Sequence, residues 1–451
     1  MKISRRPLLA LLLFSFCLPL GAAQAADGKP ARPHIIFILT DDLGPGDLGC
    51  YGGRQAPTPR IDQLAKEGTR FAQYYSASPV CSPSRAGLLT GMFPARWRIT
   101  NYLQTRKGNR ASGQADFLDS GAPSVARQLK AAGYATGHFG KWHLGGGRDV
   151  DDAPKLTAYG FDEYASTWES PEPHAEIEGA TARVKRWERT AFFVDKALDF
   201  LRRHRDQPCF VQVWPDDVHT PWVPDGQAPR GDTPANFHPV LRETDRQLGR
   251  LFDGLGELGL DQNTLIIFAS DNGAHPTFDG ARSAGLRGSK WSLYEGGIRL
   301  PFIVRWPGRV PAGRVDEATV LTAVDLLPSL CAIAGAERPK GAPLDGEDLS
   351  AALIGQTLAR KQPIFWEYGG SAGRPFIYPK GRDRSPNLAV RDGSWKLLIN
   401  ADGTGAELYD LAADRAEAHD LSAEKPDLAK RLAAAAQQWW RALPAPPPVT
   451  P

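Results

Sequence analysis

The sequence predicts an α/β fold, in which helices sandwich a large, mostly parallel sheet and a small antiparallel sheet with a helix follows. Short apolar runs recur along the chain, and amphipathic helical stretches lie between them. The chain has 451 residues, more than the roughly 250–300 that one hydrophobic core usually serves. We therefore expect a large domain over residues 30–360 and a C-terminal α+β subdomain over residues 361–445.

The first 25 residues have the pattern of a signal peptide. Lys2, Arg5 and Arg6 form a basic start, residues 7–20 are apolar but too short to span a membrane, and residues 23–25 read A-x-A. The arginine pair also resembles a twin-arginine signal. We expect a periplasmic or secreted protein, and no later apolar run predicts a membrane span.

Four apolar runs have the length and composition of buried parallel strands. They are residues 34–39, 134–140, 209–214 and 264–270. The helical stretches around them are residues 61–67, 81–91, 124–132, 191–204 and 236–258. This alternation predicts a doubly wound sheet, so the carboxyl ends of the four strands should meet at one edge.

The C-terminal part has a different pattern. After a strand near residue 302 and a helix at 323–334, the expected elements are a strand at 363–369, a hairpin at 387–400 turning at 392–393, a strand at 407–411 and a helix at 425–443. The Pro-rich residues 446–451 are expected to be disordered. The G-x-S-x-G string at 369–373 precedes Pro375, which would break the helix that a nucleophile elbow needs.

Composition limits the class of function. The formal net charge is +3, and residues 1–25 carry three basic residues and no acid, so the remainder is near neutral and predicts no nucleic-acid partner. Of the five cysteines, Cys17 lies in the signal segment. If Cys81 is modified, at most one disulfide can form, and the absence of C-x₂-C spacing argues against zinc.

Polar residues follow each of the four apolar runs. In chain order they are Asp41 and Asp42, Lys141 and His143, His219, and Asp271 and Asn272. The carboxylate and amide oxygens suit Ca²⁺ or Mg²⁺ better than zinc, and the imidazoles are candidates for proton transfer. Each alone could be an ordinary turn residue, but their shared position after buried strands predicts one site.

The string CSPSRAGLLTG at residues 81–91 predicts the start of a helix, since Pro83 is tolerated in a first turn. Cys81 would then lie where the helix dipole favours negative charge, and Arg85 would add a cation one turn later. The residues alone leave two interpretations open: a small buried cysteine and a thiolate nucleophile.

A third interpretation comes from a resemblance. The string at 81–91 resembles the signature C-x-P-S-R-x-x-x-L-T-G of the type I sulfatases, within the alkaline phosphatase-like superfamily. The stretches similar to other motifs of that family are residues 39–53, 58–68, 140–145, 270–273 and 288–301. The resemblance covers about residues 32–425 and is nearest to arylsulfatase and N-acetylgalactosamine-6-sulfatase-like members. It implies a catalytic role for the domain at 30–360.

In that family the cysteine is oxidised before folding to 3-oxoalanine (Cα-formylglycine), which acts as its hydrate. The resemblance implies that one Ca²⁺ is held by Asp41, Asp42, modified Cys81, Asp271 and Asn272. It implies that the sulfate is surrounded by Arg85, Lys141, His143, His219 and Lys290. One hydroxyl of the hydrate would attack sulfur, His219 with Lys290 would protonate the leaving alcohol, and His143 would deprotonate the second hydroxyl so that sulfate leaves.

The sequence therefore predicts an exported sulfuric ester hydrolase acting on a sulfated carbohydrate or an aryl sulfate. The candidate leaving-group contacts, chosen because they lie near the motifs, are Trp222, His275, Asp279 and Arg282. A formylglycine-generating enzyme or an anaerobic sulfatase-maturating enzyme would be a partner. The alternatives are a phosphate or phosphonate ester hydrolase of the same superfamily and a catalytically inactive protein that binds sulfated glycans.

Overall fold

The computed structural model describes residues 32–169, 174–179, 182–225, 231–369 and 376–445. The predicted signal peptide, Ser371 of the G-x-S-x-G string and the C-terminal tail lie outside these ranges. Within them, no helix is both long and apolar enough to cross a membrane. The cysteines in the described ranges, Cys50, Cys81, Cys209 and Cys331, are all free thiols.

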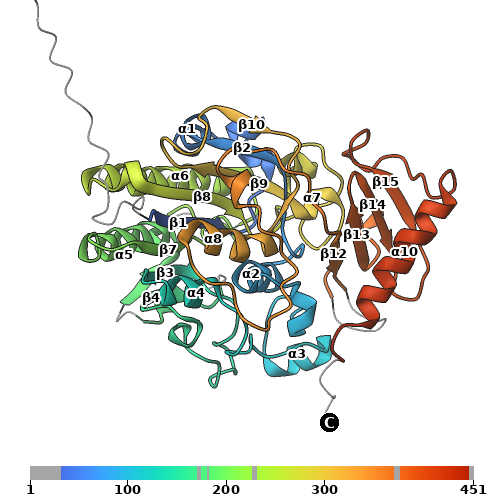
Figure 1. The fold of residues 1–451 in the computed structure, drawn as a ribbon, viewed down its shortest axis with the longest axis horizontal. Helices are drawn as coiled ribbons and strands as arrows, with labels where there is room; N and C mark the ends of the chain where they lie inside the picture. Colours follow the sequence, from blue (N-terminus) through green and yellow to red (C-terminus); the bar gives the residue numbers. More distant parts are fainter. Residues whose placement is uncertain (1–31, 170–173, 180–181, 226–230, 370–375, 446–451) are drawn as a thin grey trace, which may run out of the picture. The chain divides into compact units, whose positions relative to one another are not determined.

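Nine of the described strands form one mixed sheet in the order β10-β2-β9-β8-β1-β7-β3-β4, with β11 beside β2 (Figure 1). Their bounds are β1 His34–Thr40, β2 Thr69–Tyr75, β3 Ala135–Lys141, β4 Glu163–Thr167, β7 Cys209–Trp214, β8 Thr264–Ser270, β9 Arg299–Arg305, β10 Arg314–Asp316 and β11 Leu321–Thr322. β9 pairs antiparallel with β2 and β8. Such mixed sheets are common in α/β folds.

The four strands predicted from apolar runs are confirmed as neighbours in the parallel part of this sheet. β1 pairs in parallel with β8 on one side and β7 on the other, and β3 pairs in parallel with β7. Side chains of β1 alternate between two cores: Phe37 belongs to one and Ile38 to the other. Because both faces are buried, the strand has no polar alternation, and the four carboxyl ends share one edge.

Helices cover both faces of the sheet (Figure 1). One core receives apolar side chains from α2 Cys81–Thr90, α4 Val125–Ala131, α8 Leu326–Ala334 and α9 Ser350–Leu353. The other receives them from α1 Pro59–Glu67, α5 Arg189–Arg203 and α6 Pro234–Glu257. Two further short helices are α3 Arg106–Ser112 and α7 Glu295–Ile298. The predicted helices are confirmed to within a few residues.

The C-terminal segment folds as a separate antiparallel sheet with α10 Pro426–Arg441 packed on it (Figure 1). Its strands are β12 Ile364–Glu367, β13 Leu388–Asp392, β14 Trp395–Ile399 and β15 Glu407–Asp410, in that order. The predicted hairpin is confirmed, with Gly393 at φ 61° in the β13–β14 turn. The domain boundary at residue 360 stays a prediction.

Several strands gave no clear sequence signal. β2 lies near the edge of the large sheet, and several of its residues are only half-buried, so its residues form no continuous apolar run. β4 forms an outer strand. β5 His174–Ile177 and β6 Ala182–Lys185 pair with each other in a separate two-stranded sheet, which meets β4 through a bridge between Glu178 and Ser166. Strands with weak burial carry little periodicity, which explains why the sequence did not reveal them.

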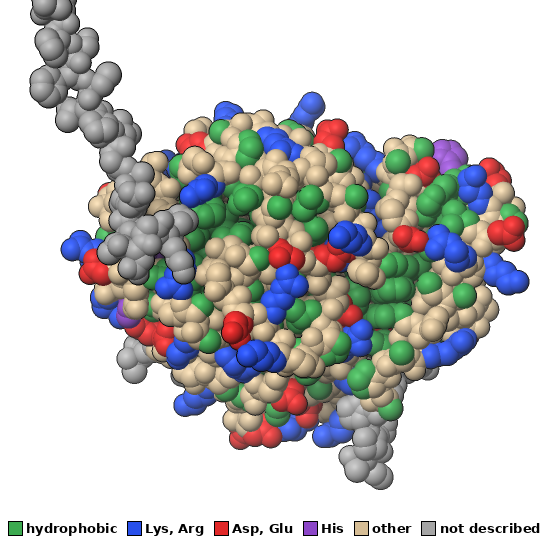
Figure 2. Space-filling model, in the orientation of Figure 1, with side chains coloured by type: hydrophobic (Ala, Val, Ile, Leu, Met, Phe, Trp, Pro, Cys, Tyr) green, Lys and Arg blue, Asp and Glu red, His purple; other side chains and the backbone are tan. Residues whose placement is uncertain are grey.

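The surface is mixed in charge. On the face shown in Figure 2, lysine and arginine side chains are interspersed with aspartate and glutamate side chains. This distribution matches the near-neutral charge of the chain beyond residue 25.

Candidate active site

Four oxygen-bearing side chains meet where β1 and β8 end. Asp41 and Asp42 follow β1, Asp271 and Asn272 follow β8, and all four are fully buried. The backbone N–H of Asp42, which has a φ of 58°, donates to Oδ1 of Asp271 at 3.2 Å. Nδ2 of Asn272 donates to Oδ1 of Asp42 at 2.6 Å. The paired parallel strands thus bring the predicted oxygen donors together.

These residues have the donor chemistry of a hard divalent cation site. Oδ1 of Asn272 is buried and has no hydrogen-bond partner among the described residues, so this oxygen is available to an ion. Carboxylate and amide oxygens are the ligands that Ca²⁺ takes in proteins. The residues present therefore fit the metal that the sequence predicts, while the structure does not identify the ion.

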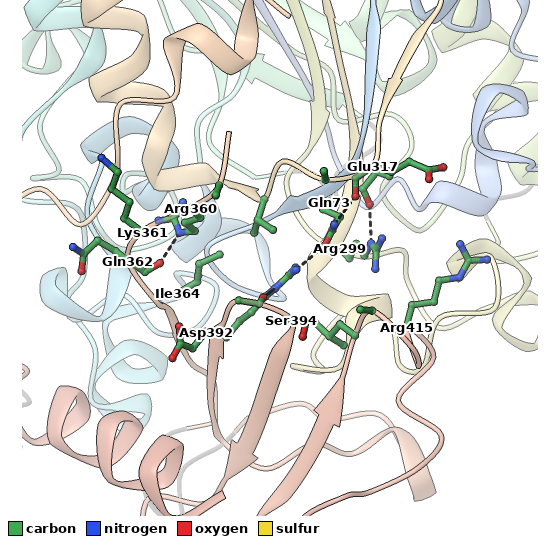
Figure 3. Close-up of a pocket in the computed structure, with 18 of the residues that line it drawn as sticks. Gln73, Arg299, Glu317, Arg360, Lys361, Gln362, Ile364, Asp392, Ser394 and Arg415 are labelled. Atoms are coloured by element: carbon green, nitrogen blue, oxygen red, sulfur yellow. Dashed lines mark hydrogen bonds between the residues drawn. The ribbon is translucent and has the colours of Figure 1, made fainter. Parts of the chain in front are cut away.

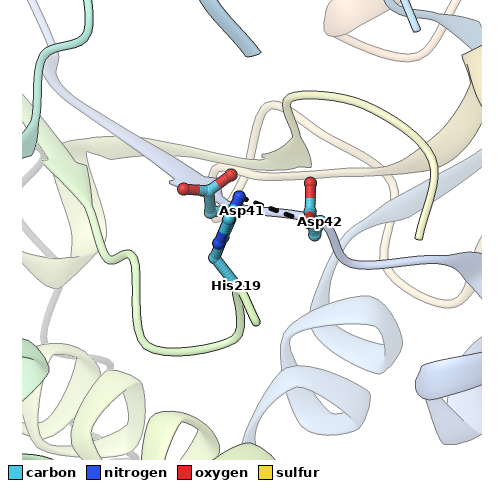
Figure 4. Close-up of side chains that lie close together, drawn as sticks. All are labelled: Asp41, Asp42 and His219. Atoms are coloured by element: carbon cyan, nitrogen blue, oxygen red, sulfur yellow. Dashed lines mark ion pairs between the residues drawn. The ribbon is translucent and has the colours of Figure 1, made fainter. Parts of the chain in front are cut away.

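One cluster of possible ligand atoms includes His219, which lies outside the predicted ligand set. Candidate ligand atoms of Asp41, Asp42 and His219 lie within 4.8 Å of one another, and the three side chains converge in Figure 4. The carboxylate of Asp271 is instead held by Arg85, whose Nε and Nη2 donate to Oδ2 at 3.0 and 2.7 Å. His219 therefore lies directly beside Asp41 and Asp42.

Two lysines neutralise the aspartates. Nζ of Lys141, from the end of β3, lies 2.5 Å from Oδ2 of Asp41, and Nζ of Lys290 lies 2.7 Å from Oδ1 of Asp42. Burial alone would raise the pKa of Asp41, but the charge of Lys141 holds it well below its usual range. Lys290 likewise overcomes burial and lowers the pKa of Asp42 to about 2. Both carboxylates are therefore anionic at neutral pH, as a metal ligand must be.

Asp271 shows the opposite effect. Burial and the nearby charge of Asp41 raise its pKa well above the usual range, although Arg85 opposes this. Arg85 also donates from Nη1 to the carbonyl of Lys141 at 2.6 Å. The buried guanidinium thus joins the ends of β3 and β8.

Cys81 begins α2 and is only 2% exposed. The residue before it, Val80, has extended φ and ψ angles, as expected of a residue that caps a helix. Oγ of Ser82 accepts the backbone N–H of Leu103, and Oγ of Ser84 donates to the carbonyl of Ser78. The predicted helix start at residue 81 is confirmed, and these contacts fix the position of its first turn.

The hydrogen bonds of His219 define its tautomer. Its Nδ1 lies 2.5 Å from the carbonyl oxygen of Thr220, which can only accept, so Nδ1 carries the proton. Its Nε2 lies 3.0 Å from the ammonium of Lys290, which can only donate, so Nε2 carries the lone pair. Burial and the charge of Lys290 lower the pKa of His219 to about 3. His219 is therefore neutral, and the mobile proton of this pair resides on Lys290.

A cluster of buried charged side chains contacts the loop that carries His219 and fixes its position. Nη2 of Arg186 donates to the carbonyl of His219. Nη1 of Arg189 pairs with Oδ2 of Asp216 at 3.0 Å, and both side chains are fully buried. Oγ1 and the backbone N–H of Thr190 donate to Asp217. This cluster fixes the segment between β7 and His219.

His143 is also neutral. Its Nε2 lies 3.2 Å from the carbonyl of Leu103, so Nε2 donates and Nδ1 holds the lone pair. Nδ1 is buried without a hydrogen-bond partner among the described residues. Burial, reinforced by the charge of Lys141, lowers the pKa of His143 to about 3. The free Nδ1 can therefore accept a proton.

A cavity of about 220 Å³ opens onto this constellation. The predicted site residues that line it are Cys81, Lys141, His143, His219, His275 and Lys290. The sequence analysis missed further lining residues, namely Tyr102, Arg148, Glu169, Trp291 and Ile377. Only Trp291, next to Lys290, and Arg148, after a glycine run, had a positional signal in the sequence.

Three of the four predicted leaving-group contacts lie elsewhere. Trp222 is fully buried, packs on Phe237 and donates from Nε1 to the carbonyl of Val218. Arg282 is buried, pairs with Asp47 at 2.9 Å and donates to the backbone carbonyl of Asp42 at 2.8 Å. Asp279 is exposed and does not line the cavity. These residues were chosen because they are near the motifs in sequence, but in the fold they lie beside the cavity and do not line it.

Comparison with known proteins identifies the family. The sulfatase family model matches residues 33–336. The chain belongs to the sulfatase family. A second model, described as N-sulphoglucosamine sulphohydrolase, C-terminal, matches residues 288–439. The protein is therefore a sulfuric ester hydrolase with an alkaline phosphatase-like fold, as the sequence predicted.

Curated relatives and solved structures agree. Human arylsulfatase A is 33% identical to this sulfatase over 90% of this chain and 82% of its own length. An N-acetylgalactosamine-6-O-sulfatase of Bacteroides thetaiotaomicron is 28% identical over 89% of this chain and 92% of its own. The crystal structure of Ps i-CgsB in complex with k-i-k-neocarrahexaose aligns with a TM-score of 0.75 and 27% identity, covering 92% of this chain and 94% of that one.

Proposed function

We propose that this sulfatase hydrolyses the sulfate ester of a sulfated sugar or glycan fragment. The observation that carries the proposal is the placement of Cys81, at the start of α2, in one cavity with Lys141, His143, His219 and Lys290. These side chains can bind a tetrahedral anion and can donate or accept protons. Relatives named N-acetylgalactosamine-6-sulfatases and a neighbour bound to a carrahexaose support a saccharide substrate.

We further propose that Cys81 is converted to formylglycine by a formylglycine-generating or anaerobic sulfatase-maturating enzyme. The hydrated aldehyde would supply two hydroxyl groups, one to attack sulfur and one to allow the sulfate to be released. A cysteine or serine has no second hydroxyl and would stay esterified. An apolar segment and an A-x-A site before residue 26 support export to the periplasm or outside the cell.

Asp41, Asp42, Asp271 and Asn272 would hold the metal, for which Ca²⁺ is our proposal. The ion would supply positive charge next to the sulfuryl oxygens, as Lewis-acid metals do in ester hydrolysis. Lys141 and Lys290 carry further positive charge into the same cavity, where low solvent access strengthens their effect on an anion. Arg85 orients the carboxylate of Asp271 and the end of β3.

The proton transfers follow from the tautomers. Lys290 holds the proton shared with Nε2 of His219, so this pair protonates the leaving alcohol. His143 offers the unprotonated Nδ1 and accepts the proton of the hydroxyl that remains after attack. The family resemblance implied His219 with Lys290 as the acid, and the hydrogen bonds of His219 support Lys290 as the holder of the proton.

Mass spectrometry of the peptide holding residue 81, from protein made in its native host, tests the nucleophile. We expect the mass of 3-oxoalanine, and an unmodified thiol would contradict the mechanism.

A panel of sulfated mono- and disaccharides, beginning with N-acetylgalactosamine 6-sulfate, tests the substrate. Parallel assays with 4-nitrophenyl sulfate and 4-nitrophenyl phosphate separate sulfatase from phosphatase activity: a large preference for phosphate would favour a phosphate or phosphonate ester hydrolase. Protein that binds these saccharides without turnover would be an inactive glycan-binding relative.

A further inference from the structure

A second cavity lies between the edge of the large sheet and the C-terminal sheet (Figure 3). It has a volume of about 670 Å³ and is lined by β2, by residues 317–320 and 359–364, and by the β13–β14 turn. It shares no lining residue with the active-site cavity. Ligand pockets usually have volumes of about 300–1,000 Å³, so this cavity is large enough to bind a ligand of several rings.

Basic side chains outnumber acidic ones in its lining. The basic residues are Arg299, Arg360, Lys361, Arg391 and Arg415, and the acidic ones are Glu317 and Asp392. Asp392 is already paired with Arg431 at 3.0 Å. Lys361 and Arg415 are exposed, and neither has an ion-pair partner in the described part of the chain. The mouth of the cavity therefore presents positive charge to a ligand.

The inner wall contains the guanidinium group of Arg391, one nitrogen of which has no hydrogen-bond partner among the described residues. Arg391 is 4% exposed; its Nε donates to the carbonyl of Gly393 at 3.0 Å and its Nη2 to Oε1 of Gln73 at 2.6 Å. Its Nη1 is buried and has no hydrogen-bond partner among the described residues. The guanidinium lies 4.7 Å from the centroid of the Tyr75 ring and has no ion-pair partner in the described ranges, so its charge adds to the positive potential of the cavity wall.

A second arginine repeats the pattern. The Arg360 side chain is 7% exposed, and its Nη1 pairs with Oδ2 of Asp325 at 2.5 Å. Its Nε donates to the carbonyl of Gln362 at 2.9 Å, a contact visible in Figure 3, whereas Nη2 has no partner in the described ranges. Two buried guanidinium groups therefore line one cavity, that of Arg391 without a carboxylate partner and that of Arg360 paired with Asp325 and 3.8 Å from Glu347.

The remaining lining indicates the rest of the ligand. Gln73, Gln362 and Ser394 offer amide and hydroxyl groups that can hydrogen-bond to sugar hydroxyls. No aromatic side chain occurs among the described lining residues, so a nucleobase would find no ring to stack on. Anion-binding guanidinium groups beside neutral polar groups favour a saccharide that carries charged substituents.

We propose that this cavity is a second, non-catalytic binding site for a sulfated saccharide segment. The exposed Lys361 and Arg415 contact sulfate groups at the mouth of the cavity, and the buried Arg391 adds positive charge to the wall behind them. The choice of ligand class rests on the proposed function. Binding here tethers a polymeric substrate and raises its concentration near the active site, without contributing to the chemistry.

The test uses Lys361→Glu/Arg415→Glu, which changes two exposed side chains, and a matched control, Lys340→Glu/Arg205→Glu, which reverses charge at exposed positions outside the cavity. We expect KM for 6-O-sulfated chondroitin polymer to rise at least tenfold in the first variant, with kcat unchanged. Turnover of 4-nitrophenyl sulfate should be unchanged in both variants. An equal KM for the polymer in wild type and both variants would overturn the proposal.

Binding without turnover separates this inference from the proposed function. In the Cys81→Ala background, isothermal titration calorimetry with a 6-O-sulfated chondroitin octasaccharide should detect two classes of binding site. Adding Lys361→Glu/Arg415→Glu, which reverses both charges, should remove one of them. That loss would support the second site even if no saccharide were hydrolysed. Binding that persisted unchanged would overturn it. So would displacement of the octasaccharide by inorganic sulfate at equal concentration, because the sugar would then contribute nothing.

Discussion

Lys290 and His219 share one proton, with Nζ of the lysine 3.0 Å from Nε2 of the imidazole. The carbonyl of Thr220 fixes the other ring nitrogen as a donor, so the pair has only one arrangement. Asp42 raises the pKa of Lys290 above its ordinary value, against the effect of burial. The lysine is thus protonated in the resting enzyme, and the histidine orients its proton.

Replacing Lys290 with methionine tests this assignment. We expect kcat/KM to fall about 10²- to 10⁴-fold for a sugar sulfate, whose alkoxide needs a proton to leave. The loss should be much smaller for 4-nitrophenyl sulfate, whose phenolate leaves unaided. His275→Ala, which also changes the cavity lining, should lower both rates by similar factors. Equal losses for both substrates in Lys290→Met would show that the lysine only binds sulfate.

Calcium should stabilise the fold as well as support activity. Ligands that bind only the native state raise the free energy of unfolding by RT ln(1 + [L]/Kd), about 2.7 kcal/mol at a hundredfold excess over Kd. We expect EGTA to lower Tm and activity together and Ca²⁺ to restore both. Asp42→Asn should abolish the calcium dependence of Tm, whereas Asp151→Asn, at a 97% exposed side chain, should leave it intact. A Tm independent of calcium in the wild type would contradict the proposed site.

The buried pair of Arg189 and Asp216 should be costly to break. Asp216→Ala leaves a guanidinium buried without its carboxylate, and we expect a loss of about 3–5 kcal/mol in the free energy of unfolding. Asp199→Ala removes a partner of Arg203 at the surface of α5, where the expected loss is below about 1 kcal/mol. Urea unfolding of the two variants measures the difference. Similar losses would contradict this view of the charge cluster.

Stability should fall as the pH rises through a window set by Glu417. Burial raises the pKa of Glu417 from 4.5 to about 7, overcoming the opposing charge of Lys396, and the carboxylate of Glu295 adds a smaller effect in the same direction. Between these pH values the native state binds more protons than the unfolded state, so the free energy of unfolding decreases with rising pH, on the order of 3 kcal/mol. Above about pH 7 the effect should level off.

Glu417→Gln should reduce this slope to the part that Asp217 contributes, because burial also raises the pKa of Asp217 to about 6, and Glu424→Gln, at an exposed position, should keep the full slope. Denaturant midpoints measured at half-unit steps from pH 4.5 to 8 give the comparison. A slope unchanged in Glu417→Gln would place the titrating group elsewhere.

The strand ends were predictable because burial on both faces leaves a plain signal in sequence. β1 and β8 are uninterrupted apolar runs that stop at charged residues, and their parallel pairing brings Asp41 to Asp271. Lys290 was different: it follows no strand, and its sequence position alone indicated only a cation that could face an anion, while the family resemblance supplied its role. Its position depends on a loop whose path leaves no periodicity to detect.

The cavity wall was the least predictable part. Trp222 lies three residues after His219, yet it turns into the core against Phe237, while Tyr102 reaches the cavity from a segment with no motif. Arg148 and Glu169 form a bidentate pair across 21 residues of chain. Convergence of loop side chains depends on tertiary packing, and one sequence carries no local trace of it.

Every residue of α2 is buried, and this has a consequence for how an active molecule comes into being. Cys81 lies at the start of this helix with only 2% of its surface exposed, so another protein's active site cannot reach its thiol in the folded chain. If the thiol is converted as proposed, conversion competes with folding. A chain that folds before conversion keeps an unmodified Cys81. The active fraction of a preparation is then decided during synthesis, and no treatment that preserves the native state can increase it.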